Sequence, residues 1–142
     1  MNGRFWDPDG RYSKGEIKEY EYWNLEVSYR QHTLGCFIIF CKRNVERVSS
    51  LTKEELNELK NVMKDIEIAV EKAFGAARFN YFQMGNQLHN LHFHGIPRYS
   101  SDIDLLGKTW KDENFGHPPL WVKEEIGDNL VESIRSEVLK YI

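Results

Sequence analysis

The sequence predicts an α+β fold: an antiparallel sheet of about five strands, one long helix and a C-terminal helix. Strand-like segments occur in consecutive pairs, and a short turn between two of them favours antiparallel pairing. One long segment with helical spacing separates the pairs, and a second such segment ends the chain. With 142 residues, the chain is long enough for one domain, residues 1–142, and too short for two of ordinary size.

The N-terminal part is expected to be an irregular arm, residues 1–20, rich in Gly, Asp, Pro and Arg over its first fifteen positions. Residues 22–29 then alternate between apolar side chains and the polar Asn24, Glu26 and Ser28, the pattern of a half-buried strand. Gly35 precedes the apolar run 36–41, which is typical of a central strand covered on both faces.

Residues 52–74 form the clearest predicted element, one amphipathic helix. Thr52 and Glu55 have the spacing of a capping box, and Gly75 supplies a C-terminal stop. Apolar residues between them follow at helical spacing: Leu56, Leu59, Val62, Met63, Ile66, Val70 and Phe74.

Two further strands are expected over residues 79–84 and 88–96, joined by the turn signal Gly85-Asn86-Gln87. The C-terminal part is expected to consist of a loop and a helix. The loop covers about 97–121, and the helix about 123–141, with its first turn uncertain because of Gly127.

Composition excludes several classes of protein. Hydrophobic residues make up 41% and charged residues 29%, as in soluble globular proteins. The net charge of −3 provides no overall basic field for nucleic acid, although a small phosphate ligand needs only local donors. Cys36 and Cys41 are expected to be small buried hydrophobes in a reducing compartment. Neither an apolar signal segment nor a stretch of membrane-spanning length is found, so we expect a cytoplasmic protein with no membrane partner.

Histidines gather in the last predicted strand. His89, His92 and His94 fall within six residues. Because strand side chains alternate, Asn90, His92 and His94 are expected on one face, and His89 on the other with the apolar residues. The face with His92 and His94 should therefore be the open one. Alternate residues lie roughly 6.6–7 Å apart, so two imidazoles can contact one phosphate or one metal ion.

Residues 90–99, Asn-Leu-His-Phe-His-Gly-Ile-Pro-Arg-Tyr, resemble the signature of the histidine triad (HIT) family, His-φ-His-φ-His-φ-φ, often followed by Pro-Arg. The resemblance covers roughly residues 22–99 and points to the diadenosine polyphosphate hydrolase-like branch. Two positions depart from it: Asn90 replaces the first histidine, and Cys36 stands where the family often has another. His89 does not replace the missing imidazole, because adjacent strand residues face opposite ways.

The resemblance implies chemistry at two histidines. The middle histidine of the family, here His92, is the nucleophile, and imidazole is a good nucleophile near pH 7. A backbone carbonyl that holds Nδ1–H would aim Nε2 at phosphorus, giving a nucleotidyl-histidine that water releases. His94 would donate to a non-bridging oxygen. This mechanism requires no metal or organic cofactor.

Four other residues are expected to bind the nucleotide or its phosphate. Asn86 and Gln87 are placed like family side chains that contact the bridging or leaving oxygen, and Ser28 matches a position near the ribose. Asn90 can hydrogen-bond but cannot carry a proton, so we expect it to position other groups.

The residues leave alternatives open. The His-x-His pair also suits zinc, but no third ligand can be named, because His32 and His117 are distant and more typical of surface or loop histidines. Arg98 either binds phosphate or is a solvated or salt-bridged arginine at a strand end, and Cys36 is expected in the core.

Two function hypotheses follow. The chain is either a nucleotide phosphohydrolase or nucleotidyl transferase, acting on a dinucleoside polyphosphate or a nucleoside phosphoramidate, or a nucleotide-binding module with little catalysis. A purine nucleotide is the expected ligand. The resemblance implies a homodimer.

Overall fold

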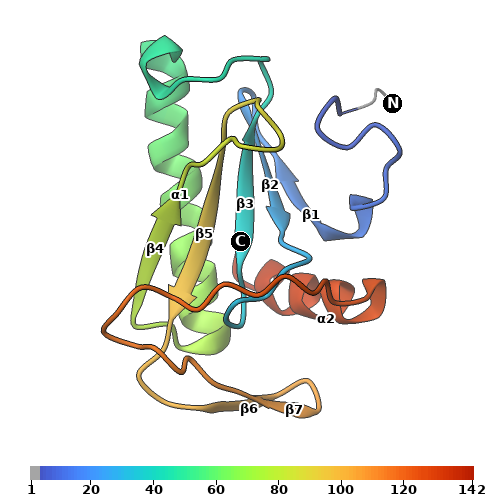
Figure 1. Cartoon of the computed structure of the whole chain (residues 1–142), viewed down its shortest axis with the longest axis vertical. Coiled ribbons are helices and arrows are strands. Elements are labelled where there is room, and N and C mark those ends of the chain that lie inside the picture. The colour runs from blue at the N-terminus through green and yellow to red at the C-terminus, as the bar shows by residue number, and fades with distance from the viewer. Residues whose placement is uncertain (1–3) are drawn as a thin grey trace.

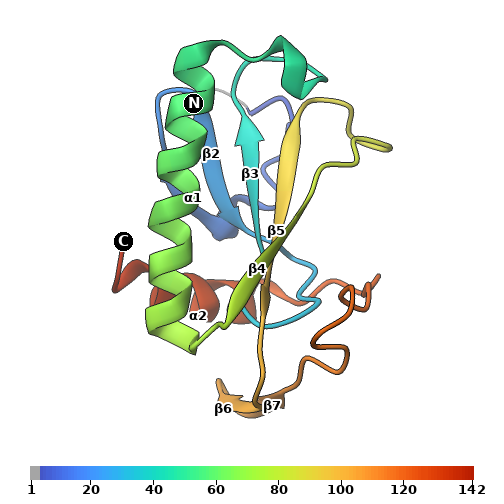
Figure 2. The same ribbon diagram turned by 90° about the vertical axis from the view of Figure 1, so that its left-hand side faces the viewer.

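The computed structural model describes residues 4–142 and confirms the α+β class (Figure 1). Five antiparallel strands form one sheet in the order β1-β2-β3-β5-β4. The long helix α1 covers one face of this sheet, as the turned view shows (Figure 2). The elements are β1 (Glu16–Glu19), β2 (Trp23–Val27), β3 (Phe37–Cys41), α1 (Lys53–Phe74), β4 (Arg78–Phe82), β5 (His92–Arg98), β6 (Ile103–Leu105), β7 (Lys108–Trp110) and α2 (Asp128–Leu139), with 3-10 turns η1 (Ser13–Gly15) and η2 (Val48–Ser50).

Helix α1 has the predicted bounds and caps. The Thr52 side chain accepts from the Glu55 backbone N–H, and the Glu55 carboxylate accepts from the Thr52 N–H in return. Gly75 ends the helix with φ 82°, a left-handed conformation that glycine adopts without steric cost. Hydrogen bonds from Arg43 lower the pKa of Glu55 to about 2, so the capping carboxylate is ionised at neutral pH.

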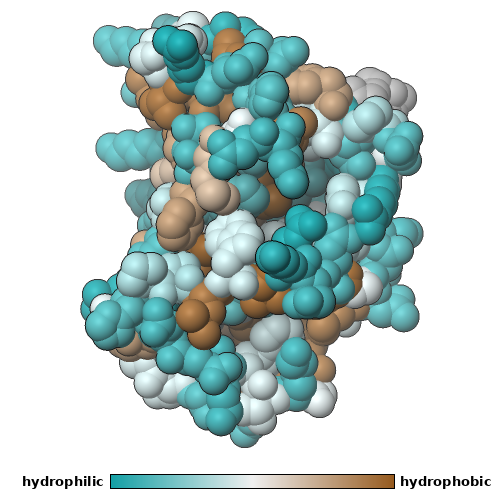
Figure 3. Space-filling model, in the orientation of Figure 1, coloured by the Kyte–Doolittle hydropathy of each residue, from teal (hydrophilic) through white to brown (hydrophobic). Residues whose placement is uncertain are grey.

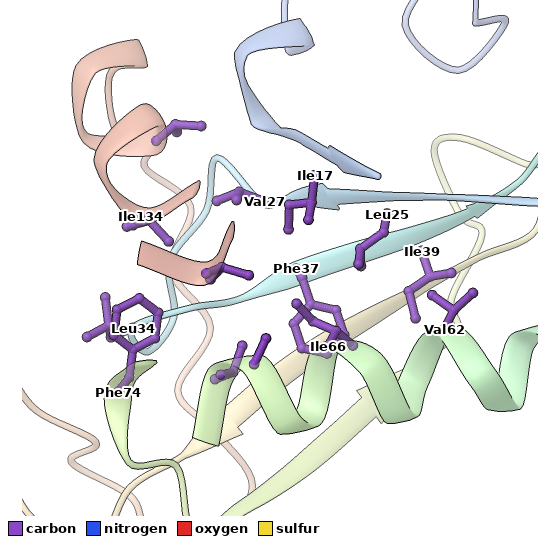
Figure 4. Close-up of a cluster of buried hydrophobic side chains, with 14 of the residues drawn as sticks. Ile17, Leu25, Val27, Leu34, Phe37, Ile39, Val62, Ile66, Phe74 and Ile134 are labelled. Carbon is purple, nitrogen blue, oxygen red and sulfur yellow. The ribbon is translucent and has the colours of Figure 1, made fainter. Parts of the chain in front are cut away.

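The core lies between α1 and the sheet (Figure 4). Alternation within β2 and β3 sends Leu25, Phe37 and Ile39 toward the helix, and each is at most 1% exposed. Ile134 of α2 closes the end of this core. The opposite side chains of β2 and β3, including Glu26, Ile38 and Phe40, are thereby presented to the other face of the sheet.

The predicted strand 88–96 begins later and ends later than expected, as β5, His92–Arg98. Before His92 the pairing with β3 stops: the Leu91 carbonyl still accepts from the Cys41 N–H at 3.0 Å, but β3 ends at Cys41 and the Leu91 N–H donates to Val45 O, at 2.6 Å. Pro97 lies within β5 without breaking it. Its carbonyl accepts from Thr33 Oγ1, so the polar main-chain atoms of Pro97 face the β3 side of β5. The pairing between β5 and β3 does not extend past Gly95, so no ladder hydrogen bond is lost.

Both terminal regions are more regular than predicted. The expected arm contains β1, a short charged edge strand paired with β2, and residues 1–3 of the arm lie outside the described residues. The expected loop contains the hairpin β6–β7. Its turn residues Leu106 and Gly107 have φ 56° and 78°, and Leu at such a position gives little turn signal in a sequence. Helix α2 begins at Asp128, with Gly127 as its N-cap.

Residues 111–127, which we call the C-terminal strap, run across the sheet on the side away from α1 (Figures 1 and 2). Arg98 fixes the first part of the strap with all five of its N–H donors. They reach both oxygens of Asp112, the carbonyls of Asn114 and His117, and Asn80 Oδ1, at 2.7–3.0 Å. Arg98 is 3% exposed. Of the two sequence-based alternatives for this residue, the structure therefore shows the salt bridge.

No helix within residues 4–142 has the length and apolar character needed to cross a membrane.

Candidate functional site

A cleft of about 680 Å³ lies on the sheet face opposite α1. Strands β2, β3 and β5 form its floor, and the β4–β5 loop, the N-terminal arm and the C-terminal strap form its rim. The same face of the molecule is drawn space-filling in Figure 3, where apolar atoms lie among hydrophilic ones near the middle. Elements far apart in sequence thus enclose one site.

His92 lies on the floor of this cleft and is oriented by the main chain. Its Nδ1 is 2.8 Å from the carbonyl oxygen of Asn90, and because a carbonyl only accepts, Nδ1 carries the hydrogen. Nε2 is then left with a lone pair. The ring stacks on Phe40, with centroids 5.5 Å apart and planes 27° apart, and is 7% exposed. Both contacts restrict rotation of the imidazole.

His94 meets His92 edge-on, with ring centroids 5.0 Å apart and planes at 70°. Burial, together with the charges of the neighbouring His92, His32 and Arg30, lowers the pKa of His94 to about 4. His94 is therefore neutral near pH 7 and offers one N–H donor and one acceptor.

Of the polar residues predicted to bind the ligand, some line the cleft and one does not. Ser28, Asn86 and Gln87 line the cleft with His92 and His94. Ser28 Oγ accepts from the Arg30 N–H at 3.1 Å. Asn86 and Gln87 are exposed in the β4–β5 loop.

Asn90 does not extend the row of histidines toward the cleft. It precedes β5, is 4% exposed, and its Nδ2 lies 3.4 Å from the carbonyl of Cys41. Its Oδ1 is buried and has no hydrogen-bond partner among residues 4–142. The alternation expected from a strand starting at residue 88 fails here because that strand starts at His92. What residue 90 gives the site is its backbone carbonyl.

Several cleft residues were not predicted from the sequence. Trp121 of the strap packs edge-on against His94, with ring centroids 5.8 Å apart, and stacks on His32, with ring centroids 4.0 Å apart. His32, expected at the surface or in a loop, therefore belongs to the cleft wall, and its Nδ1 accepts from the Val122 N–H. Arg30 adds a positive charge. No spacing in the sequence marks these residues, because the strap brings them together only after folding.

The N-terminal arm and the strap meet at the rim of the cleft. Glu125 of the strap accepts from the Tyr12 hydroxyl at 2.8 Å and from Arg11 at 2.5 Å. Tyr12 also packs edge-on against Tyr29, whose hydroxyl donates to Asp128 at 2.6 Å. These contacts join two segments that lie more than a hundred positions apart in the chain.

Other candidate residues lie away from the cleft or serve the fold. Cys36 is 2% exposed, and burial raises the pKa of its thiol to about 11, so it is not a thiolate at neutral pH. His117 contributes its carbonyl to Arg98 and does not line the cleft. Within residues 4–142, no group of three or more His, Cys, Asp or Glu side chains is arranged to hold a metal ion.

The fold and the cleft define a class of small α+β proteins that present two neighbouring strand histidines, the first held by a main-chain carbonyl. Comparison with known families gives that class its name. The family model for the HIT domain matches residues 27–101, more than half of the chain, and the chain belongs to the HIT domain family.

Solved structures have the same fold at low sequence identity. A histidine triad protein from Sinorhizobium meliloti is 18% identical, with a TM-score of 0.71 over 92% of this chain and 91% of that one. A histidine triad nucleotide-binding protein from Sulfolobus tokodaii is 20% identical, with a TM-score of 0.63 over 88% and 83%. A Plasmodium falciparum diadenosine triphosphate hydrolase is 15% identical, with a TM-score of 0.60 over 90% and 76%. Comparison with curated proteins gives no significant match.

Proposed function

We propose that this chain is a nucleotide phosphohydrolase or nucleotidyl transferase that cleaves a dinucleoside polyphosphate or a nucleoside phosphoramidate through His92. The orientation of His92 is the observation that supports this proposal most directly. With Nδ1–H held by the Asn90 carbonyl at 2.8 Å, the Nε2 lone pair is free to attack phosphorus. The likeness to a diadenosine triphosphate hydrolase in fold agrees with this reading.

In the first step, Nε2 of His92 forms a bond to phosphorus. In a dinucleoside polyphosphate the bond from phosphorus to the bridging oxygen breaks, and the electron pair leaves on the departing phosphate, which is stable as an anion. In a phosphoramidate the P–N bond breaks instead, and the amine leaves with a proton taken from solvent. The imidazole becomes cationic, and Nδ1–H remains hydrogen-bonded to a carbonyl oxygen, which stabilises the positive charge. His94, neutral because burial lowers its pKa to about 4, donates to a non-bridging oxygen.

In the second step, water attacks phosphorus, loses a proton to solvent, and the P–N bond breaks to restore neutral His92. Asn86 and Gln87, exposed at the rim of the cleft, are proposed to donate to the bridging or leaving oxygen, and Ser28 to contact the ribose. Asn90 acts through its backbone carbonyl. No proton-carrying side chain is needed at position 90 for either step.

The experiment is product analysis after incubation with diadenosine polyphosphates and with an adenosine phosphoramidate. We expect turnover with the natural chain and none with His92→Asn, which keeps a similar shape without the nucleophile. The matched control is His89→Asn, since His89 is exposed and does not line the cleft. Intact-protein mass spectrometry should detect a nucleotidyl adduct that His92→Asn lacks. Unchanged turnover in His92→Asn would show that the assigned nucleophile is wrong.

The second candidate function is a nucleotide-binding module with little catalysis. It is favoured by Asn90, which places a buried amide where the family has an imidazole. Tight nucleotide binding without turnover, even in Asn90→His, would support it. A tenfold or larger gain in Asn90→His, about 1.4 kcal/mol of transition-state stabilisation, would identify a detuned enzyme instead.

A homodimer formed through α1 and the edge strand β4 is a further part of this proposal. Leu56 and Ile68 of α1 are 45% and 38% exposed, which leaves apolar surface available for such a contact. Light scattering coupled to size exclusion measures the mass directly. The cytoplasmic location stays a prediction.

A further inference from the structure

One buried carboxylate in the cleft has no role in the proposed phosphorus chemistry. Glu26 of β2 lines the cleft and is 3% exposed. Its Oε2 accepts three hydrogen bonds, from Arg4 at 2.8 Å, Trp6 Nε1 at 3.0 Å and Asn24 Nδ2 at 2.7 Å. A carboxylate is costly to bury, so a cleft floor that holds one in place invites a functional explanation.

The other oxygen, Oε1, is available to a ligand. Among residues 4–142 no side-chain or main-chain group donates to Oε1. If Oε1 were fully buried, it would be a buried atom without a partner, but the one side-chain N or O atom of that kind in the same range is Asn90 Oδ1. Oε1 is therefore not sealed inside the protein but reaches the surface of the cleft. The three donors on Oε2 fix the carboxyl plane and so fix the direction in which Oε1 accepts.

The distance from the histidines suits the base of a bound nucleotide. Glu26 pairs with Ile38, and Ile38 pairs with His94, so Glu26 and His94 are separated by one intervening strand. At 4.7–4.9 Å per strand their Cα atoms lie about 10 Å apart. That is about the reach of a ribose and its base from a phosphate bound between His92 and His94. Ile38 and Trp6, which also line this part of the cleft, supply apolar surface for a base ring.

The chemistry of this end of the cleft favours bases that donate. Asp7, 6% exposed, also lines it, and its Oδ2 accepts from Arg4 at 3.1 Å and from the Tyr12 N–H at 3.0 Å. Burial raises the pKa of Glu26, while the Trp6 hydrogen bond and the Arg4 charge oppose that rise; in its ionised form the carboxylate accepts hydrogen bonds and cannot donate. Guanine presents N1–H and the 2-amino group side by side, whereas adenine presents its 6-amino group beside N1, an acceptor that a carboxylate repels.

We propose that Glu26 is a specificity-determining residue that selects guanine over adenine at the nucleoside end of the cleft. This inference rests on the proposed function in placing the phosphate at His92 and His94. It narrows the substrate class to guanine-containing nucleotides. Arg4 acts as a positioning residue, since it holds the carboxylates of Glu26 and Asp7 and does not itself contact the ligand.

Equilibrium binding of mononucleotides tests the inference without requiring turnover. By calorimetry, we expect GMP to bind at least about tenfold more tightly than AMP, as the loss of one hydrogen bond to a charged group implies. IMP, which keeps N1–H and lacks the 2-amino group, should fall between them. Glu26→Gln should bring the ratio of GMP affinity to AMP affinity toward one, because the Gln side chain can present its amide N–H as a donor to adenine N1.

The matched control is Glu16→Gln. Glu16 also binds Arg4, at 2.7 Å, but its side chain is 40% exposed and does not line this cleft. The control should keep the natural ratio, which separates loss of an Arg4 partner from loss of the base contact. Should Glu26→Gln fail to fold, the ratios of GMP, IMP and AMP with the natural chain still decide the matter.

Three results would overturn the inference: equal affinities for GMP and AMP, tighter binding of AMP, or an equal loss for both nucleotides in Glu26→Gln, which would place the carboxylate on the ribose. Failure of the proposed function looks different. If the chain binds GMP tenfold more tightly than AMP but turns over no nucleotide, the inference about base selection holds and the proposed enzyme function fails. The same preference in His92→Asn would show that base selection and catalysis are separable.

Discussion

The buried ion pair between Arg98 and Asp112 gives the sharpest stability prediction. The side chains are 3% and 2% exposed, and all five donors of Arg98 are used. Replacing Asp112 by Asn removes the charge that compensates Arg98 and keeps the shape. Breaking a buried pair by changing one partner costs about 3–5 kcal/mol, because the remaining charge stays buried without compensation. We therefore expect Asp112→Asn to lose about 3–5 kcal/mol in the free energy of unfolding.

Urea denaturation followed by circular dichroism measures this loss. The matched control is Lys111→Gln, which removes an exposed pair with Asp102 at 3.9 Å, with both side chains more than half exposed. Exposed pairs contribute about 0–1 kcal/mol, so the control should be close to neutral. A loss for Asp112→Asn within the range of the control would refute the reasoning. Because Arg98 also holds the strap that carries Trp121, the same variant should bind nucleotide more weakly than the control at a temperature where both are folded.

Three further predictions concern single positions. In Gly95→Ala the added Cβ would lie 2.2 Å from the Phe37 ring, so we expect a loss of about 1–3 kcal/mol by urea denaturation, with the double variant Gly95→Ala/Phe37→Leu losing less than the sum. The pKa of Glu55 is lowered to about 2, so its contribution is complete above about pH 5 and is lost as pH falls toward 2; Glu55→Gln should be less stable at pH 7 and show a smaller drop in stability between pH 5 and 2. Asn90→Ala keeps the backbone carbonyl that orients His92 and should therefore change turnover by less than about tenfold, whereas a complete loss would assign the side chain an essential role.

The parts of the fold that sequence reasoning predicted are those with local signals. Helix α1 was predicted to within one residue, because Thr52, Glu55 and Gly75 mark its ends and its apolar residues repeat with the helical period. Strands β2, β3 and β4 were found by alternation or by continuous apolar runs. The start of β5 was not, since it depends on where the partner strand β3 ends, and that is a tertiary property.

The site divides in the same way. His92 and His94 were placed together by the spacing of one strand, and the cleft includes both. Asn90 was expected on the same face, but it lies outside the strand and is buried. Trp121 and His32 could not be predicted, because they meet through a strap whose path depends on long-range bonds from Arg98 and to Tyr29. Glu26 was recognised as polar and strand-borne, but its burial depends on Trp6 and Arg4, from a part of the chain that was expected to be irregular.

The joining of Tyr12 and Arg11 to Glu125 has a practical consequence for work with this protein. Residues 4–12 carry two of the three partners of Glu26, Arg4 and Trp6, and two partners of Glu125, Arg11 and Tyr12. Removing residues 4–12 would leave the histidines of β5 unchanged but would open the nucleoside end of the cleft to solvent. A truncated protein that folds and keeps phosphate chemistry would therefore report a false substrate preference. Assays of selectivity therefore need residues 4–12 in place and free of contact with a fused tag.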